Sequence, residues 1–559
     1  MKRAVVVSVI LLFFAGVPLF SQWEGEDDLS FDFDRDWRRK PLIPNDNLIF
    51  GQPEFLDFDL GMEAGYNDGV WGGVGVRMDY RGGPLSIVAD LVFKNDQKYA
   101  PTRVMIPAGN LAGLYFFMNE GGVSYDSRPF SLSAGRFRIY DEVDSPYSLF
   151  VNSLGHTAVT MKARYESKHW IYQSRWIELN SRNTVSSPAW NEYNRRKAGL
   201  SSPTDWSTPS SDYGPNPAKT DGLSDWGFPD RGVNYKVYAL KVNDWRLGFL
   251  DAVVYTGRSF DLEYFLNPIP QFFINYAKDT PGRPWSTDSN ENALTGFFWD
   301  VNKKDSWDAY AQILIDDFSV GFAKSLFSGF SDNPWKTAWS LGGRVHTSAG
   351  RFGFHHGGAL KFTFEPIGTD ENGRYAWDAA ATAYGYTYYP ETRYFDSENG
   401  GEQVNILIED NMVGYKHGEN NLAFQVDYQN TFQRFLVTAE LELLLAGANS
   451  PANPWQQHYS RSGYYDSGKS GSQLLDGPFE KRLEFRVNVS RKIGPVALWG
   501  AFALGGRWDK LVLAEPDPDA NHSTPQETVD NDIWIWKPSG GRELIFRISL
   551  GFKYTLGVL

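Results

Sequence analysis

The chain has 559 residues, no cysteine and a formal net charge of −14. The lack of cysteine excludes a disulfide-stabilised secreted scaffold, and the acidic balance argues against nucleic acid as a partner. Aromatic residues make up 16% of the chain, although its mean hydropathy is negative at −0.41. This combination is typical of strands that turn one face toward an apolar solvent and the other toward water.

The N-terminus has the pattern of a secretory signal peptide. Lys2 and Arg3 form a basic start, residues 4–20 are mostly apolar, and Ser21 is a small residue at the expected cleavage point. We therefore predict a cleaved signal peptide over residues 1–21 and export from the cytoplasm. Residues 22–53 are expected to form either a periplasmic tail or a small plug, and their composition does not decide between the two.

From residue 54 to residue 559, polar and apolar residues alternate in one segment after another. The clearest examples are 159–166, 422–429, 435–443, 483–490 and 544–558. The last of these is longer than a usual strand of a soluble sheet. After the signal no segment is apolar for long enough to form a transmembrane helix. We therefore predict an all-β fold, a transmembrane antiparallel β-barrel of about 18 strands (roughly 16 to 20).

The connections between the predicted strands are alternately short and long. Residues 167–169, 243–244 and 301–305 form short connections, whereas 181–232 and 509–532 form long ones. Short periplasmic turns and long extracellular loops are typical of bacterial outer-membrane barrels. We therefore expect an outer-membrane location, with membrane lipid and the barrel-assembly machinery as partners.

Several motifs that could carry chemistry lack the context that the chemistry needs. The stretch "GYYDSGKS" at 463–470 matches a phosphate-binding loop, but neither a buried strand before it nor a helix after it is expected. His355 and His356 are adjacent in a predicted strand, so they point to opposite faces and do not share a metal. The acidic loop 515–532 lacks the ligand spacing of an EF-hand. We predict no catalytic residue, no metal and no cofactor.

The predicted inner faces of the strands carry charges of both signs. We expect Arg164, Glu440, Arg486 and Arg547 to line the pore, where opposite charges on adjacent strands can pair. A wide barrel needs a polar interior, and this need alone explains the four residues. Selection of solutes by charge is the functional alternative.

Four segments between residues 130 and 318 resemble the Wzi-type family of capsule-assembly outer-membrane proteins. They are "SLSAGRFRIYDEVDSPYSLFVNS" (131–153), "YFLNPIPQFFINY" (264–276), "SNENALTGFFWDV" (289–301) and "DAYAQILIDDF" (308–318). The order and spacing of these pieces are similar to those of the family. The resemblance implies a barrel of about 18 strands that retains or assembles surface polysaccharide without enzymatic activity.

The same resemblance implies a set of ligand-binding residues for surface glycan: Arg136, Asn267, Asn292, Asp316 and Asp317. Two other functions stay open, namely a general or substrate-selective porin and a barrel-embedded hydrolase.

Asp316 and Asp317 follow seven residues that suit an apolar surrounding, in the predicted strand 307–316. The short turn before this strand places its end at the extracellular rim. A charge costs only about 0–1 kcal/mol near that interface and far more at the bilayer midplane. The pair is therefore interpreted first as the exit of the strand from the membrane, second as a ligand site, and last as a catalytic pair.

Overall fold

The structure is a computed structural model. It describes residues 55–67, 69–95, 108–180, 231–256, 258–278, 291–303, 306–316, 337–363, 393–396, 402–405, 412–447, 471–475, 479–514 and 535–557. The predicted signal peptide, the segment 22–53, Asp317, the phosphate-loop match and most of the acidic loop lie outside these residues.

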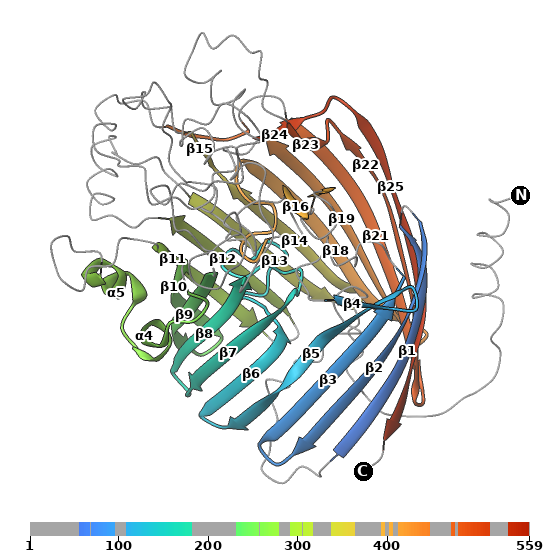
Figure 1. The fold of residues 1–559 in the computed structure, drawn as a ribbon, viewed down its shortest axis with the longest axis horizontal. Helices are drawn as coiled ribbons and strands as arrows, with labels where there is room; N and C mark the ends of the chain where they lie inside the picture. Colours follow the sequence, from blue (N-terminus) through green and yellow to red (C-terminus); the bar gives the residue numbers. More distant parts are fainter. Residues whose placement is uncertain are drawn as a thin grey trace, which may run out of the picture. The chain divides into compact units, whose positions relative to one another are not determined.

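Nineteen antiparallel strands form one sheet, of which β4 is a four-residue strand and the other eighteen run round a closed barrel (Figure 1). The prediction of about 18 strands is confirmed. The strands of this sheet are β1 (Phe55–Asn67), β2 (Val70–Gly82), β3 (Leu85–Lys94), β4 (Ala108–Leu111), β5 (Leu114–Ser127), β6 (Phe130–Arg138), β7 (Thr157–Glu166), β8 (Trp170–Asn180), β9 (Arg231–Val242), β10 (Trp245–Thr256), β11 (Glu291–Lys303), β12 (Trp307–Asp316), β13 (Thr337–Thr347), β14 (Gly350–Ala359), β18 (Asn421–Phe432), β19 (Phe435–Gly447), β21 (Phe479–Ile493), β22 (Val496–Trp508) and β25 (Arg542–Gly557).

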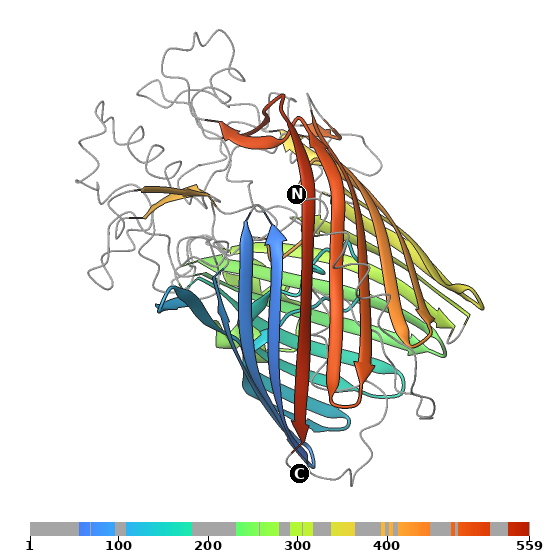
Figure 2. The ribbon, with the colours of Figure 1, turned by 90° about the vertical axis from the view of Figure 1, so that its right-hand side faces the viewer.

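The barrel closes where its first strand pairs with its last. Asp57 of β1 lies opposite Gly557 of β25, and the pairing continues to Asn67 opposite Arg547. Figure 2 shows the blue β1 beside the red β25. Closure leaves no unpaired edge in the wall, which is the condition for a sheet to span a membrane.

Tight turns connect the strands at the end of the barrel that holds the start of β1. One of them, between β21 and β22, contains Gly494, whose φ of +58° lies in the left-handed region that favours glycine. The long connections lie at the opposite end. This parity is the predicted one, and it assigns the tight turns to the periplasmic side and the long connections to the extracellular side.

The two faces of the wall differ in polarity as the alternation predicted. Leu60, Leu247 and Leu544 are exposed on the outer face. Asp59 in β1 instead points inward and bonds to Lys553 of β25 at 2.7 Å. An apolar outer face and a polar inner face identify the wall as a transmembrane barrel of the outer-membrane type.

Two segments leave the wall and fold into its interior. We call residues 139–156, between β6 and β7, the inward segment, and residues 412–420, just before β18, the second inward segment. Nearly every described side chain in both is buried or half-buried.

Two helices, α4 (Leu262–Leu266) and α5 (Gln271–Lys278), lie between β10 and β11, outside the ring of strands (Figure 1). No helix among the described residues is long and apolar enough to cross a membrane. Three short two-stranded antiparallel sheets complete the described elements: β15 (Lys361–Thr363) with β20 (Gly471–Gln473), β16 (Arg393–Asp396) with β17 (Glu402–Asn405), and β23 (Leu511–Ala514) with β24 (Ile535–Pro538).

Candidate functional site in the barrel lumen

The inward segment carries apolar side chains into the lumen. Tyr147, Leu149, Phe150 and Val151 are all fully buried. They belong to one cluster with inward-facing apolar residues of the wall: Ile171, Ile177, Val233, Val237, Leu250, Val254, Leu294 and Leu314. Apolar residues on the inner face of a wide barrel would otherwise meet water, so the segment and this part of the wall remove each other's apolar surface from water. We call the inner face of β8–β12 the apolar sector.

Asp141 fixes the shape of the inward segment and attaches it to the wall. Its carboxylate accepts hydrogen bonds from the main-chain N–H of Phe150 at 3.0 Å and of Val151 at 3.3 Å. The Tyr235 hydroxyl of β9 donates to it at 2.6 Å and the Gln312 amide of β12 at 3.1 Å. Burial raises the pKa of Asp141, and these donors act against that rise.

Glu142, the next residue, bridges two arginines of the wall. Its carboxylate lies 2.7 Å from the guanidinium of Arg164 in β7 and 2.6 Å from that of Arg246 in β10. Burial by itself would raise the pKa of Glu142, but the two neighbouring cations lower it to about 2. The carboxylate is therefore charged at neutral pH and stabilises two guanidinium groups at once.

A chain of hydrogen bonds continues from the inward segment to the strands on its far side. The Ser145 hydroxyl contacts the hydroxyl of Tyr310 at 2.7 Å and that of Ser340 at 2.8 Å. Tyr310 then contacts His355 Nδ1 at 2.9 Å, and His355 Nε2 contacts Asp427 at 2.6 Å. These groups are almost fully enclosed, which suits a structural connection between β12, β13, β14 and β18.

The opposite orientation predicted for His355 and His356 is confirmed. His355 points inward to Tyr310, whereas His356 Nε2 accepts from Trp339 Nε1 at 3.0 Å on the outer face. Among the described residues no group of three or more histidine, cysteine or acidic side chains is arranged to hold a metal ion.

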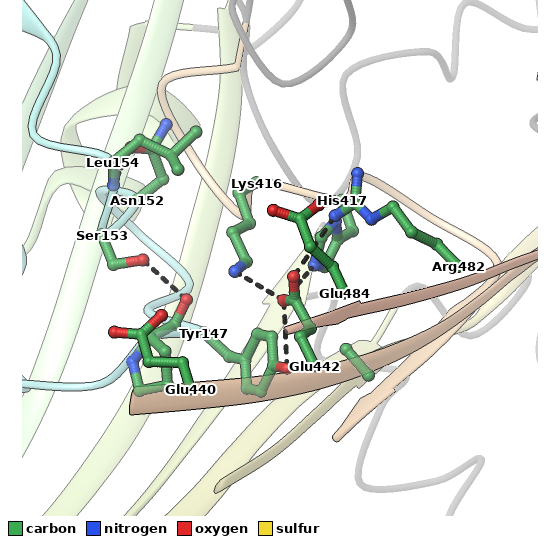
Figure 3. Close-up of polar contacts among 12 residues, drawn as sticks. Tyr147, Asn152, Ser153, Leu154, Lys416, His417, Glu440, Glu442, Arg482 and Glu484 are labelled. Atoms are coloured by element: carbon green, nitrogen blue, oxygen red, sulfur yellow. Dashed lines mark hydrogen bonds and ion pairs between the residues drawn. The ribbon is translucent and has the colours of Figure 1, made fainter. Parts of the chain in front are cut away.

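The two inward segments meet inside the barrel. The main-chain N–H of Asn152 donates to the carbonyl of Val413 at 2.8 Å, and the Asn152 amide donates to Met412 at 2.5 Å. Figure 3 shows the side chains around this junction. Because one main-chain bond and one side-chain bond join them, the two segments form one connected unit inside the barrel, which we call the internal barrier.

Glu442 of β19 joins both inward segments to the wall (Figure 3). Its carboxylate accepts hydrogen bonds from the Lys416 ammonium at 2.9 Å, the Tyr147 hydroxyl at 3.2 Å and the Arg486 guanidinium at 2.9 Å, and His417 Nε2 lies 3.4 Å away. Burial lowers the pKa of His417 to about 4, although its contact with Glu442 opposes this change. His417 is therefore neutral at pH 7. Burial also raises the pKa of Tyr147, which stays protonated.

Ion pairs line the rest of the interior. Arg77 bonds to Asp79 and Glu120, Lys553 to Asp59, and Arg547 to Glu484. The Arg547 side chain keeps 43% of its surface exposed although it points inward, so water reaches it from the lumen. We call the inner face of β19, β21, β22, β25, β1, β2, β3 and β5 the charged sector.

The predicted pore-lining residues are distributed between the two sectors. Arg164 contacts the inward segment through Glu142, beside the apolar sector. Arg486 contacts Glu440 at 3.3 Å and Arg547 contacts Glu484, both in the charged sector. Every one of them has a charged partner, and whether any selects a solute stays a prediction.

The predicted ligand residues do not form one cluster. Asn292 of β11 and Asp316 of β12 share the inner face near the extracellular end, because Leu294 lies opposite Asp316 and Asn292 is two residues further. Asn267 lies at the end of α4, on the outer face of the wall, and accepts a bond from Lys236. Arg136 of β6 donates to the Thr157 carbonyl at 3.4 Å.

Asp316 is the last described residue of β12, and its interpretation as the exit of the strand from the membrane stays a prediction. Asp317 lies outside the described residues. The ligand role of all five residues stays a prediction.

Sequence reasoning missed the residues that build the internal barrier, above all Asp141, Glu142 and Tyr147. One signal was available. The connection 139–156 is rich in aliphatic and aromatic residues and has few glycines, whereas the connection 181–232 is rich in Ser and Pro. A long connection rich in aliphatic and aromatic residues has no reason to lie in water.

Comparison with known proteins gives only distant matches. No family model matches the chain, and no curated protein matches it in sequence. Among solved structures, the chain is similar to Wzi of Escherichia coli, described as an outer-membrane protein of group 1 capsule assembly and a carbohydrate-binding β-barrel, with 10% identity. The match covers 89% of this chain and 83% of Wzi, with a TM-score of 0.45.

The chain is also similar to OprD of Pseudomonas aeruginosa, with 9% identity over 91% of this chain and 97% of OprD and a TM-score of 0.39. OccAB2 of Acinetobacter baumannii gives 9% identity, 91% and 99% coverage, and a TM-score of 0.39. These likenesses are too distant to carry an argument about ligands, and they do not single out the capsule-assembly family. The strands, their closure and their two faces make the chain an outer-membrane β-barrel of eighteen strands.

Proposed function

We propose that this chain is a non-enzymatic outer-membrane barrel that retains or helps to assemble surface polysaccharide, and that it is not a general diffusion porin. One observation carries the second part. Tyr147, Leu149 and Phe150 fill the apolar sector with a packed core, and the two inward segments are bonded to each other. General diffusion needs a wide aqueous path, and the packed core fills the part of the lumen beside β8–β12 and so narrows that path.

The proposal that the chain is not an enzyme rests on the hydrogen bonds and ion pairs of three carboxylates in the lumen. Asp141, Glu142 and Glu442 are each engaged by several donors of the inward segments or the wall. A general acid or base needs access to a substrate and a hydrogen-bonding position that is free to receive it. These three carboxylates support a structural role instead.

The polysaccharide part rests on the resemblance of residues 131–153, 264–276, 289–301 and 308–318 to the capsule-assembly family. Asn292 and Asp316 are the two predicted ligand residues that the fold places on one face, at the extracellular end. An amide and a carboxylate together offer both donors and acceptors to sugar hydroxyls. We therefore assign the proposed glycan contact to this pair first.

Two measurements test the proposal together. Deletion of the gene in its host should reduce cell-surface polysaccharide, and the purified barrel in a planar bilayer should show no large steady conductance. The variant Asn292→Ala combined with Asp316→Asn should reduce glycan binding. Asn302→Ala, at the periplasmic end of the same strand β11, is the matched control and should leave binding unchanged.

A substrate-selective porin is the second candidate, and the charged sector favours it. Paired charges that keep contact with water, as Arg547 does, can line a path for a charged solute. A large steady conductance, together with unchanged surface polysaccharide after gene deletion, would replace our proposal with this one. Release of sugar or fatty acid by the purified barrel would instead support the hydrolase.

A further inference from the structure

The outer face of β9 and β10 carries polar residues at a depth where a barrel usually faces lipid. Lys236 lies in the middle of β9, and Asp251 lies opposite it in the middle of β10. The neighbours Tyr235, Val237, Leu250 and Ala252 belong to the core inside the barrel, so alternation turns Lys236 and Asp251 outward. A charged side chain facing lipid near the midplane destabilises a barrel, more for Lys than for Asp.

The segment with α4 and α5 covers these residues from outside. The Lys236 ammonium donates to the carbonyl of Asn267 and, at 3.1 Å, to that of Ile269. The Asp251 carboxylate accepts from the main-chain N–H of Gln271, and the Gln271 side chain donates to the Asp251 carbonyl at 2.9 Å. Both wall residues are almost fully buried beneath the helices.

Further bonds attach the same segment to the outer face of β8 and β9. Ser174 donates to the carbonyl of Phe265 at 2.7 Å, Trp176 to that of Ser259 at 2.6 Å, and Tyr238 to that of Pro268 at 3.0 Å. A second apolar core, distinct from the one in the lumen, forms beneath the helices from Val253, Tyr255, Tyr264 and Ile274, with Trp176 and Ala293 packed against it. The cover is therefore a built part of the wall.

Most of the exposed residues of this cover are apolar, and the exposed charge, Glu263, is paired with Lys278 at 3.2 Å. Leu262, Leu266, Ile269 and Phe273 are each about half or more exposed, Leu266 to 63%. The apolar band of the strands continues beside them, with Leu247 exposed to 60% and Leu240 and Phe297 also exposed. The cover thus replaces a polar patch of the outer wall with an apolar one that is continuous with the lipid-facing band.

We propose that α4 and α5 form an outer cover that contacts the acyl chains of the outer leaflet through Leu262, Leu266, Ile269 and Phe273. Lys236 and Asp251 hold the cover to the wall through its main chain, which leaves its apolar side chains directed away from the wall. The occupant is lipid rather than a second copy of the chain, because the exposed side chains extend the apolar band that the strands already present on both sides. This inference is independent of the proposed glycan function.

Fluorescence quenching tests the proposal, and the natural absence of cysteine makes labelling specific. Leu266→Cys carries an environment-sensitive dye in phospholipid vesicles. Leu247→Cys, in the lipid-facing band, is the positive control. Lys303→Cys, at a periplasmic turn, is the aqueous control. Heat-modifiable migration on gels establishes that each variant is folded.

We expect the dye at position 266 to be quenched by doxyl-labelled lipid to within about twofold of the Leu247→Cys sample, and to be shielded from iodide. Quenching by iodide with insensitivity to doxyl lipid, as for Lys303→Cys, would overturn the proposal. Shielding from both quenchers that disappears when the protein is diluted in lipid would also overturn it, because a second copy would then be the occupant.

A second variant tests the anchors. Lys236→Met keeps an unbranched side chain, one atom shorter, but removes the ammonium that donates to the Asn267 and Ile269 carbonyls. We expect the dye at position 266 to become several-fold more sensitive to iodide in this background while the barrel stays folded. Unchanged quenching would contradict the role of Lys236 as an anchor of the cover.

Discussion

The apolar and charged sectors of the lumen are built on strands of the same alternating kind, yet they differ in what their inner faces contact. In the apolar sector Leu250 and Leu314 pack against the inward segment and are fully buried. In the charged sector Arg547 pairs with Glu484 and still meets water. Stability in the first sector depends on a segment that is not part of the wall, whereas the second is stabilised within the wall. The two sectors should therefore respond very differently to mutation.

Removing the inward segment should change the barrel most. The inner face of the apolar sector would then meet water, as that of the charged sector already does. We expect replacement of residues 141–154 by a short Gly-Ser linker to expose the inner face of β8–β12 to water and to open a steady conductance in planar bilayers. Phe150→Leu, which nearly conserves volume and polarity, should stay closed. A barrel that lacks the segment but conducts no more than the parent would show that the segment is not the barrier.

Glu142→Gln should strongly destabilise the folded barrel, because it leaves Arg164 and Arg246 without their shared carboxylate. Breaking one partner out of a buried ion pair costs about 3–5 kcal/mol. Because Arg164 keeps Glu166 and Arg246 keeps Asp300, we expect a loss toward the lower end of this range. Glu166→Gln is the matched control: Glu166 also pairs with Arg164 but is 40% exposed, so we expect less than about 1 kcal/mol. Denaturant unfolding of both variants in detergent measures the difference, and equal losses would contradict this prediction.

The free energy of unfolding should depend on pH through His417, which lies in the second inward segment. Its pKa is about 4 in the folded chain and 6.5 in the unfolded chain, so the unfolded state binds the proton first as pH falls. The stability associated with neutral His417 is present above pH 6.5 and is lost down to about pH 4, by roughly 3 kcal/mol. We expect His417→Asn to flatten this part of the curve. The stability that comes from charged Glu142 is present above pH 4.5 and is lost as the pH falls toward 2, so it changes the curve mainly below the His417 interval.

Arg547→Gln should have the smallest effect. Its partner Glu484 keeps a second bond to Arg486 at 2.6 Å, and exposed ion pairs contribute about 0–1 kcal/mol. We expect a change within that range in denaturant unfolding and no change in conductance. A loss comparable to that of Glu142→Gln would show that the charged sector is as tightly constrained as the apolar one.

The wall could be predicted from sequence because each strand shows its alternation of polar and apolar residues within a single short segment of the chain. In β25, the side chains of Phe546 and Ile548 face lipid while that of Arg547 faces the lumen, and this period of two is visible without any tertiary information. The number of strands followed from counting such segments and from the even number that is required when both termini lie on the periplasmic side.

The internal barrier and the outer cover could not be predicted in this way, because neither is periodic. Tyr147 finds its partner Glu442 at a separation of 295 residues, and no pattern in the chain connects them. Asn267 and Asn292 are close in sequence but lie on opposite faces of the wall, which their order in the chain does not reveal. Lys236 and Asp251 did carry a signal: both are charges at lipid-facing positions in the middle of predicted strands, and such positions need a cover.

The junction between the two inward segments has a consequence for the order of assembly. Asn152 bonds to Met412 across 260 residues of chain, so this contact forms only after the strands between them are present. The entropy of closing so long a loop favours the nearest-neighbour hairpins first. We therefore expect a cysteine introduced at position 149 to react rapidly with a thiol reagent in folding intermediates. It should become protected only late, near the time when β1 pairs with β25. An unfinished barrel would then be leaky, and the membrane would be sealed only by a complete one.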